Sequence, residues 1–153
     1  MVQRGTVEML GSWMALVRKV RDNFPGLETE EALEDHRKTV LKFMGRGEAL
    51  CVREDGQVVG VLLYSSKHNM ICCLAVDPAC RRRGYASALL AEALRSLDRT
   101  RDITVSTFRE GDPWGDAPRA LYAKFGFMPS ELTVEFGYPN QVFRLRANPN
   151  CPG

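Results

Sequence analysis

Residues 70–97, MICCLAVDPACRRRGYASALLAEALRSL, contain the transition that decides the fold. The first part, residues 70–76, is apolar on both faces, which is typical of a central strand covered on two sides. An Asp-Pro pair ends this strand, and apolar residues then recur at helical spacing over residues 82–98. The stretch therefore predicts a buried strand, a turn that contains Gly84, and an amphipathic helix.

The remainder of the chain predicts elements on both sides of this unit. Helical periodicity predicts helices over residues 13–24 and 29–45, separated by a Pro-Gly elbow, and a short helix over residues 117–125. Strand patterns occupy residues 49–53 and 58–64, residues 103–108, and a final pair, 132–136 and 141–146, joined through residues 137–140. We expect an α/β (α+β) fold of three layers, in which a mixed, mostly antiparallel sheet of about seven strands is flanked by helices.

Length and composition predict one domain over residues 1–147, followed by a disordered tail over residues 148–153. The net charge of +2 is too close to neutral to indicate a nucleic-acid or membrane partner. No apolar run approaches the roughly 20 residues of a membrane span, and the N-terminus lacks a secretory signal, so we expect a cytoplasmic protein. The five cysteines lack metal-ligand spacing, so we expect buried reduced thiols and no metal site.

The turn between the central strand and its helix has features of an anion site. A helix start exposes unpaired N–H groups and the positive end of the helix dipole, so a turn with Gly84 can hold a pyrophosphate. Arg81, Arg82 and Arg83 add positive potential, and arginine can bind phosphate oxygens in a bidentate manner. Neither G-x-x-x-x-G-K-[ST] nor G-x-G-x-x-G occurs after a strand, which argues against nucleotide-hydrolase and dinucleotide sites.

Two motifs resemble one known family. Arg81-x-x-Gly84-x-Ala86 matches every defined position of the acetyl-CoA signature [Q/R]-x-x-G-x-[G/A] of the GNAT family of N-acetyltransferases. Residues 120–127, ALYAKFGF, resemble the L-Y-x-K-x-G-F region of the same family. The order of the predicted elements is also similar to that family over nearly the whole chain.

This resemblance implies acetyl-CoA as the cofactor and transfer of its acetyl group to a primary amine by direct attack in a ternary complex. The backbone of Leu74 and Val76 would pair with the pantetheine arm, and the Leu74 amide would stabilise negative charge on the thioester carbonyl oxygen. Tyr122 would donate a proton to the departing thiolate, although it could instead be an ordinary packing aromatic. The cofactor-binding positions that the resemblance implies are Leu74, Ala75, Val76, Arg81, Arg82, Arg83, Gly84, Tyr85, Ala86 and Ser87.

The chain departs from the family pattern at two positions. Met70 stands where many histone-acetylating members carry a glutamate as general base. His68 is close in sequence and could titrate near neutrality, but it could equally be an exposed turn residue, so the base is left unassigned. Gly115 stands where an asparagine often helps to hold the cofactor arm.

The acceptor is expected to be an amine of a small molecule or of a protein, held by Phe24, Trp114, Glu135 and Tyr138. Trp114 and the acids beside it could attract a cationic amine by charge and by cation–π contact, or could belong to a solvated loop. Two other functions stay open: a catalytically silent acyl-CoA-binding sensor or partner-binding module, and nucleic-acid binding through the arginine triplet, which we do not expect. The sequence allows a monomer or a homodimer.

Overall fold

In the part of the chain that the structure describes, the fold is built on one sheet of seven strands. The computed structural model describes residues 1–24 and 26–148, without the side chain of Asn23, so most of the expected tail lies outside the described residues. The strands are β1 (Val2–Arg4), β2 (Ala49–Glu54), β3 (Gln57–Ser65), β4 (Met70–Val76), β5 (Ile103–Phe108), β6 (Met128–Glu135) and β7 (Tyr138–Leu145). Their order is β1-β2-β3-β4-β5-β7-β6, and every neighbouring pair is antiparallel except β4 and β5.

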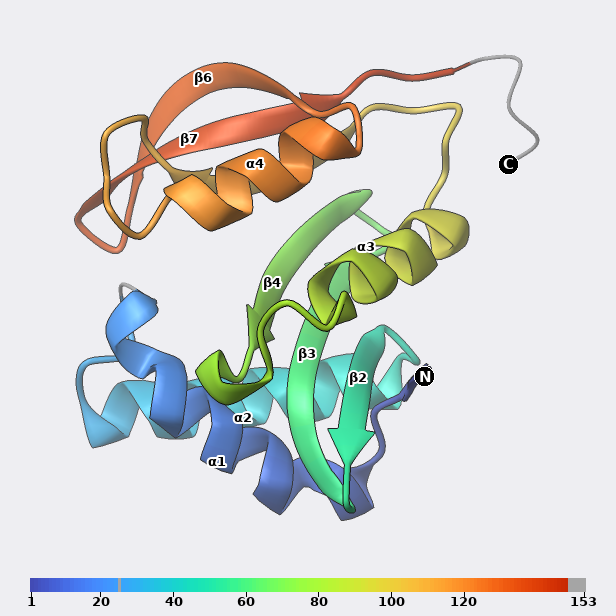
Figure 1. Cartoon of the computed structure of the whole chain (residues 1–153), viewed down its shortest axis with the longest axis vertical. Helices are drawn as coiled ribbons and strands as arrows, with labels where there is room; N and C mark the ends of the chain where they lie inside the picture. The colour runs from blue at the N-terminus through green and yellow to red at the C-terminus, as the bar shows by residue number, and fades with distance from the viewer. Residues whose placement is uncertain (25, 149–153) are drawn as a thin grey trace.

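Four α-helices of the described residues lie on the two faces of this sheet (Figure 1). They are α1 (Leu10–Val20), α2 (Glu30–Gly45), α3 (Tyr85–Ser96) and α4 (Asp116–Lys124), with short 3₁₀ turns η1 (Val7–Met9), η2 (Arg21–Asn23) and η3 (Pro78–Cys80). The side chain of Thr29 accepts a hydrogen bond from the Ala32 amide at 3.0 Å and so caps α2, whose first turn carries two glutamates. No α-helix of the described residues is both long and apolar enough to cross a bilayer.

Alternation along the strands divides the core into two clusters. The residues that pack with α1 and α2 include Ala49, Cys51, Val61 and Leu63. Their sequence neighbours, which point to the opposite face and pack with α3, include Leu50, Val52, Leu62 and Tyr64. Because successive side chains of a strand point to opposite faces, both faces must be covered, and the predicted three-layer α/β fold is confirmed.

The structure differs from the sequence expectations at the edges of the sheet. The strand β1 was not predicted, because three residues are too few to display a period of two. The last hairpin turns at Phe136 and Gly137, both with positive φ, and not at residues 137–140 as expected. A phenylalanine is uncommon at positive φ, whereas the following Tyr-Pro-Asn resembles turn chemistry, so the sequence favoured the wrong position.

Candidate active site

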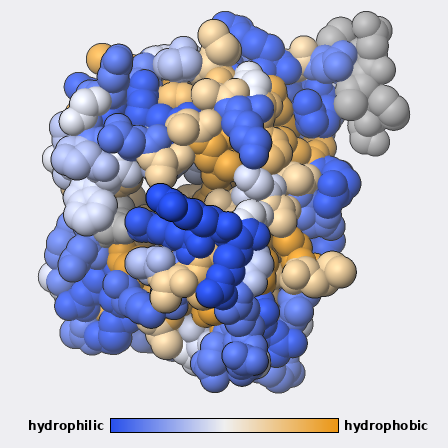
Figure 2. Space-filling model, viewed as in Figure 1, coloured by the Kyte–Doolittle hydropathy of each residue, from blue (hydrophilic) through white to orange (hydrophobic). Residues whose placement is uncertain are grey.

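A break in the pairing of β4 and β5 creates the site. These parallel strands pair at only two positions among the described residues, Met70 with Thr104 and Ile71 with Val105. Cys72 then forms a bulge, since the pairing with β3 passes from Ile71 directly to Cys73. A bulge bends its strand, and beyond this one β4 and β5 diverge around a cleft of about 850 Å³. Figure 2 shows the molecule hollowed between its two halves on this face.

The far half of β4 presents free backbone groups to this cleft. The amide of Asp77 donates a hydrogen bond to the Val59 carbonyl oxygen at 2.8 Å, so the backbone groups of these two residues point toward each other between β3 and β4. In an antiparallel pair, residues whose backbone groups bond to the partner strand alternate with residues whose backbone groups point away from it. The N–H and C=O groups of Leu74 and Val76 therefore point away from β3. The N–H and C=O groups of Ala75 bond to β3. Ala75 therefore lines the cleft but has no free backbone group for a ligand.

The arginine-rich turn closes one end of the cleft. Arg82 and Gly84 both adopt the left-handed conformation, with φ of 66° and 77°, and α3 starts immediately afterwards. Gly84 is the N-cap of α3 and provides no side-chain cap, so the first amides of the helix stay available. The cleft lining from this segment consists of Arg81, Arg82, Gly84, Tyr85, Ala86 and Ser87.

Unlike the other residues that the resemblance assigns to cofactor binding, Arg83 does not line the cleft. Its guanidinium instead lies 2.5 Å from the carboxylate of Glu54, at the end of β2. The Tyr85 hydroxyl donates to the same carboxylate, and the Cys80 thiol lies 3.8 Å from it. The side chain of Arg83 therefore faces a neighbouring hairpin, while Arg81 and Arg82 face the cleft.

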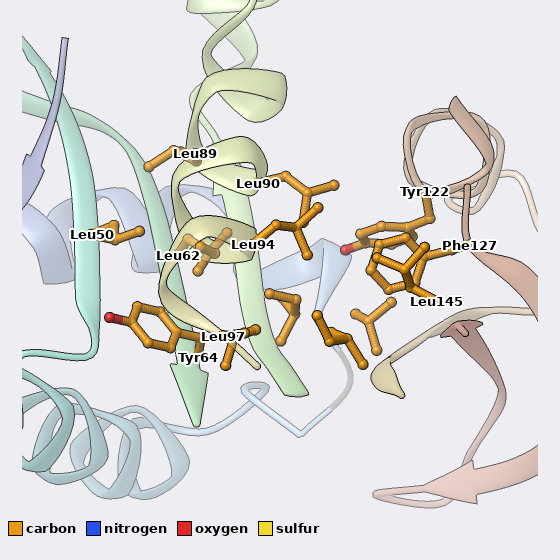
Figure 3. Close-up of a cluster of buried hydrophobic side chains, with 14 of the residues drawn as sticks. Leu50, Leu62, Tyr64, Leu89, Leu90, Leu94, Leu97, Tyr122, Phe127 and Leu145 are labelled. Atoms are coloured by element: carbon orange, nitrogen blue, oxygen red, sulfur yellow. The ribbon is translucent and has the colours of Figure 1, made fainter. Parts of the chain in front are cut away.

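Tyr122 lies on α4, opposite the free edge of β4. Its side chain is only 4% exposed and contacts the rings of Phe127 and Phe143, with centroids 5.7 and 6.1 Å away. The ring reaches from α4 toward α3 (Figure 3), and Tyr122 lines the cleft. Burial raises the pKa of this phenol, and the nearby thiol of Cys73 raises it further. Tyr122 is therefore protonated throughout the neutral range.

The cysteine thiols do not all fit the expectation of burial. Cys51 and Cys80 are buried as expected and Cys73 is partly buried, but Cys72 is exposed because it is the bulge residue. Burial raises the pKa of Cys73 to about 12, so a thiolate is strongly disfavoured at this position. Cys151 lies outside the described residues. The described residues include no cluster of three or more potential metal ligands.

The opposite end of the cleft is aromatic and acidic. Phe24, Trp114 and Glu135, which the sequence analysis assigned to the acceptor, line this end together with Phe136. Phe136 is 82% exposed and covers Gly26, where an added Cβ would lie 2.8 Å from the ring. The elbow after α1 and the turn between β6 and β7 therefore touch, although nothing in the sequence signals this contact.

Tyr138 does not line the cleft. Its hydroxyl donates to Asp112 at 2.6 Å, and its ring packs edge-to-face on Phe108 with centroids 5.7 Å apart. Asp112 in turn accepts a hydrogen bond from the Trp114 amide. Tyr138 therefore supports the loop that carries Trp114, which indicates a structural contribution to the aromatic, acidic end of the cleft.

The two positions that depart from the family pattern, Met70 and Gly115, lie in different surroundings. Met70 lines the cleft, whereas His68 lines a separate cavity with Arg46 and Glu48, so the structure does not bring His68 to the site. Asp116 and Glu135 are the carboxylates in the described lining. At Gly115 an added Cβ would lie 2.9 Å from the Cβ of Phe108, so the packing disfavours an asparagine there.

Known proteins share this architecture. An acetyltransferase of the GNAT family from Bacillus cereus is 22% identical with a TM-score of 0.72, and the match covers 97% of both chains. A ribosomal-protein-alanine N-acetyltransferase from Brucella melitensis is 20% identical with a TM-score of 0.70, covering 94% of this chain and 97% of that one. A PaiA N-acetyltransferase from Thermoplasma acidophilum, in complex with coenzyme A, is 15% identical with a TM-score of 0.68, covering 95% and 98%.

No protein of curated function matches the chain in sequence. The model of the acetyltransferase (GNAT) family matches residues 13–127, which include β4, the arginine-rich turn and Tyr122 but not the part of the cleft lining contributed by Glu135, Phe136 and Asn140. The cofactor of this family is acetyl-CoA, and the free strand edge and the cationic turn suit its amide-rich arm and its pyrophosphate. Because the family model matches more than half of its length, the chain belongs to the GNAT family of acetyltransferases.

Proposed function

We propose that this protein transfers an acetyl group from acetyl-CoA to a primary amine of a small molecule or protein, by direct attack within a ternary complex. The observation that carries the proposal is one continuous cleft with an anion-binding turn at one end and an aromatic, acidic lining at the other. Tyr122 lies along the same cleft. Two reactants can therefore enter from different sides and meet beside one proton donor.

In this proposal the cofactor lies along the end of the cleft formed by β4 and the turn before α3. Leu74 and Val76 hydrogen-bond the pantetheine arm through the backbone groups that point away from β3. The amides of the turn and of the start of α3 hold the pyrophosphate, with the side chains of Arg81 and Arg82 beside it. The Leu74 amide also points at developing negative charge on the carbonyl oxygen.

Tyr122 supplies the proton that the leaving thiol requires. The neutral amine nitrogen forms a bond to the thioester carbonyl carbon and the C–S bond breaks. The departing sulfur takes up one proton from Tyr122, and the proton that the amine loses passes to solvent, which restores the phenol. Burial keeps the Tyr122 phenol protonated at neutral pH, so it is available as a proton donor. A phenol can act in this way only if it is held within hydrogen-bond reach of the sulfur.

The acceptor end suits a cationic amine attached to an apolar body. Asp116 and Glu135 provide negative charge, and the cationic lining residues, Arg81 and Arg82, belong to the turn at the cofactor end. Phe24, Trp114 and Phe136 provide aromatic surface. An ammonium group can be attracted both by the carboxylates and by the indole face.

The decisive experiment incubates the protein with acetyl-CoA and a panel of amines. The panel includes arylalkylamines, polyamines, amino acids and short peptides with free N-termini. Acetylated products are identified by mass spectrometry, because the exposed Cys72 thiol would contribute to a chemical thiol assay. We expect acetylation of at least one amine, with uncharged alcohols of the same shape left unmodified. Coenzyme A binding without acetylation of any amine would instead support the silent binding module.

A further inference from the structure

We infer that Glu54 is a positioning residue that fixes the arginine-rich turn in its anion-binding shape. Glu54 ends β2, in the hairpin that precedes β3, and is about thirty residues away from the turn in sequence. Its partners are Cys80, Arg83 and Tyr85, which lie on both sides of the left-handed residues Arg82 and Gly84. The inference rests on the proposed function, in which this turn is the binding site of the pyrophosphate.

The contacts of Glu54 form a clasp, defined here as its carboxylate together with the side chains of Arg83 and Tyr85. Arg83 Nη1 lies 2.5 Å from both carboxylate oxygens, and the Tyr85 hydroxyl donates to Oε2. The Arg83 guanidinium, and after it the Tyr85 hydroxyl, hold the pKa of Glu54 below its usual range. The carboxylate is therefore ionised at neutral pH, and the clasp is formed under ordinary conditions.

The turn needs such support because its backbone is strained. Arg82 has a φ of 66°, a conformation that costs a residue with a Cβ on the order of 1 kcal/mol or more. Strained residues persist when the surrounding structure over-determines them. The residue after Arg82 and the first residue of α3 are both held by Glu54, so the clasp restrains the turn on either side of Gly84.

Charge alone gives the opposite expectation for Glu54. A carboxylate close to an anion site repels the anion, so a purely electrostatic influence of Glu54 would weaken pyrophosphate binding. The clasp also directs Arg83 away from the cleft, while Arg81 and Arg82 face it. Glu54 therefore favours cofactor binding only if its effect on the shape of the turn exceeds its repulsion of the phosphates. The sign of the affinity change on removing it separates these two effects.

The test compares Glu54→Ala and Glu54→Gln with a matched control, Glu92→Ala. Glu92 pairs with Arg95 on the exposed side of α3 and does not line the cleft. We expect Glu54→Ala to raise the KM for acetyl-CoA and the Kd for coenzyme A about tenfold, with kcat at saturating acetyl-CoA within about twofold of wild type. Glu54→Gln, which retains neutral hydrogen bonds, should show a smaller increase in KM, and Glu92→Ala should show none.

The alternatives predict different results. Tighter binding of coenzyme A by both Glu54 variants would show that repulsion dominates and would overturn the inference. A lower melting temperature with an unchanged KM would show that Glu54 stabilises only the fold. If Glu54→Ala does not fold, Tyr85→Phe removes one contact of the clasp while keeping the ring, and an unchanged KM in that variant would also overturn the inference.

A further variant separates this inference from the proposed function. Gly84→Ala alters the turn directly and does not touch Glu54. If Gly84→Ala weakens coenzyme A binding but the Glu54 variants do not, the proposed pyrophosphate site is supported and the positioning role of Glu54 is refuted. If neither substitution affects the affinity for coenzyme A, the proposed site itself is wrong.

Discussion

The two ends of the cleft are built in different ways. The cofactor end comes from one continuous stretch, β4 through the first turn of α3, and offers mainly backbone groups whose direction is set by strand pairing and a helix start. The end proposed for the acceptor is assembled from three distant parts of the chain, Phe24, residues 113–116 and residues 135–140, and offers mainly side chains. The first arrangement can be read from a short motif, whereas the second is specific to this chain.

The largest expected effect concerns Tyr122, which lies between the two ends. Replacing Tyr122 with phenylalanine keeps the ring packing but removes the proposed proton donor, so we expect kcat to fall by about 100-fold or more. The KM for acetyl-CoA should change by less than about twofold, because the hydroxyl contributes little to ground-state binding. Steady-state kinetics with a responsive amine provide the measurement.

Tyr64→Phe is the matched control for this substitution. Tyr64 is also buried, and its hydroxyl donates to the Gly47 carbonyl oxygen at 3.2 Å, away from the cleft. We expect its kcat to equal that of the wild type. Equal turnover in wild type and Tyr122→Phe would assign Tyr122 to packing alone.

A smaller effect is expected for the cofactor end. Gly84→Ala should raise the Kd for coenzyme A about tenfold, because alanine resists a φ of 77° and would re-aim the amides of the turn. Gly47→Ala introduces a similar strain, with φ of 72°, at a turn that does not line the cleft. Both variants should lose about 1 kcal/mol of folding free energy, but only Gly84→Ala should bind coenzyme A more weakly. A similar Kd in the two variants would contradict a special contribution of the turn.

The smallest effect is expected at the acceptor end. Trp114 is 50% exposed, and a cation–π contact at an exposed site contributes about 0.5–1 kcal/mol, so Trp114→Ala should raise the KM for the amine about two- to fivefold. The KM for acetyl-CoA should stay constant. Met128→Ala, which removes another exposed apolar residue that does not line the cleft, should leave both values unchanged. An unaltered KM for the amine in Trp114→Ala would remove Trp114 from the acceptor site.

The elements that the sequence predicted are those with local causes. An Asp-Pro stop, a glycine before a helical stripe and a doubly apolar strand act within a few residues, so β4, the turn and α3 were predictable. The three-layer arrangement follows from alternation along β2 and β3, which requires both faces of the sheet to be covered.

The features that the sequence did not reveal depend on contacts between distant segments. The contact of Glu54 with Arg83, and that of Phe136 with Gly26, form only after the sheet has assembled, and neither leaves a periodic pattern. The bulge at Cys72 is similar, since an extra residue in a strand can be recognised only against its partner. These contacts nevertheless decide which arginines face the cleft, which thiol is exposed and how the acceptor end is closed.

The central claim is that the cofactor lies along the free edge of β4 with its pyrophosphate on the turn before α3. At 17.2 kDa the protein is small enough for amide chemical shifts to be followed by NMR during titration with coenzyme A. We expect the largest shift changes at the amides of Leu74, Val76 and residues 82–87. If these amides were unchanged while those around the Arg46–His68 cavity moved, the account would be contradicted.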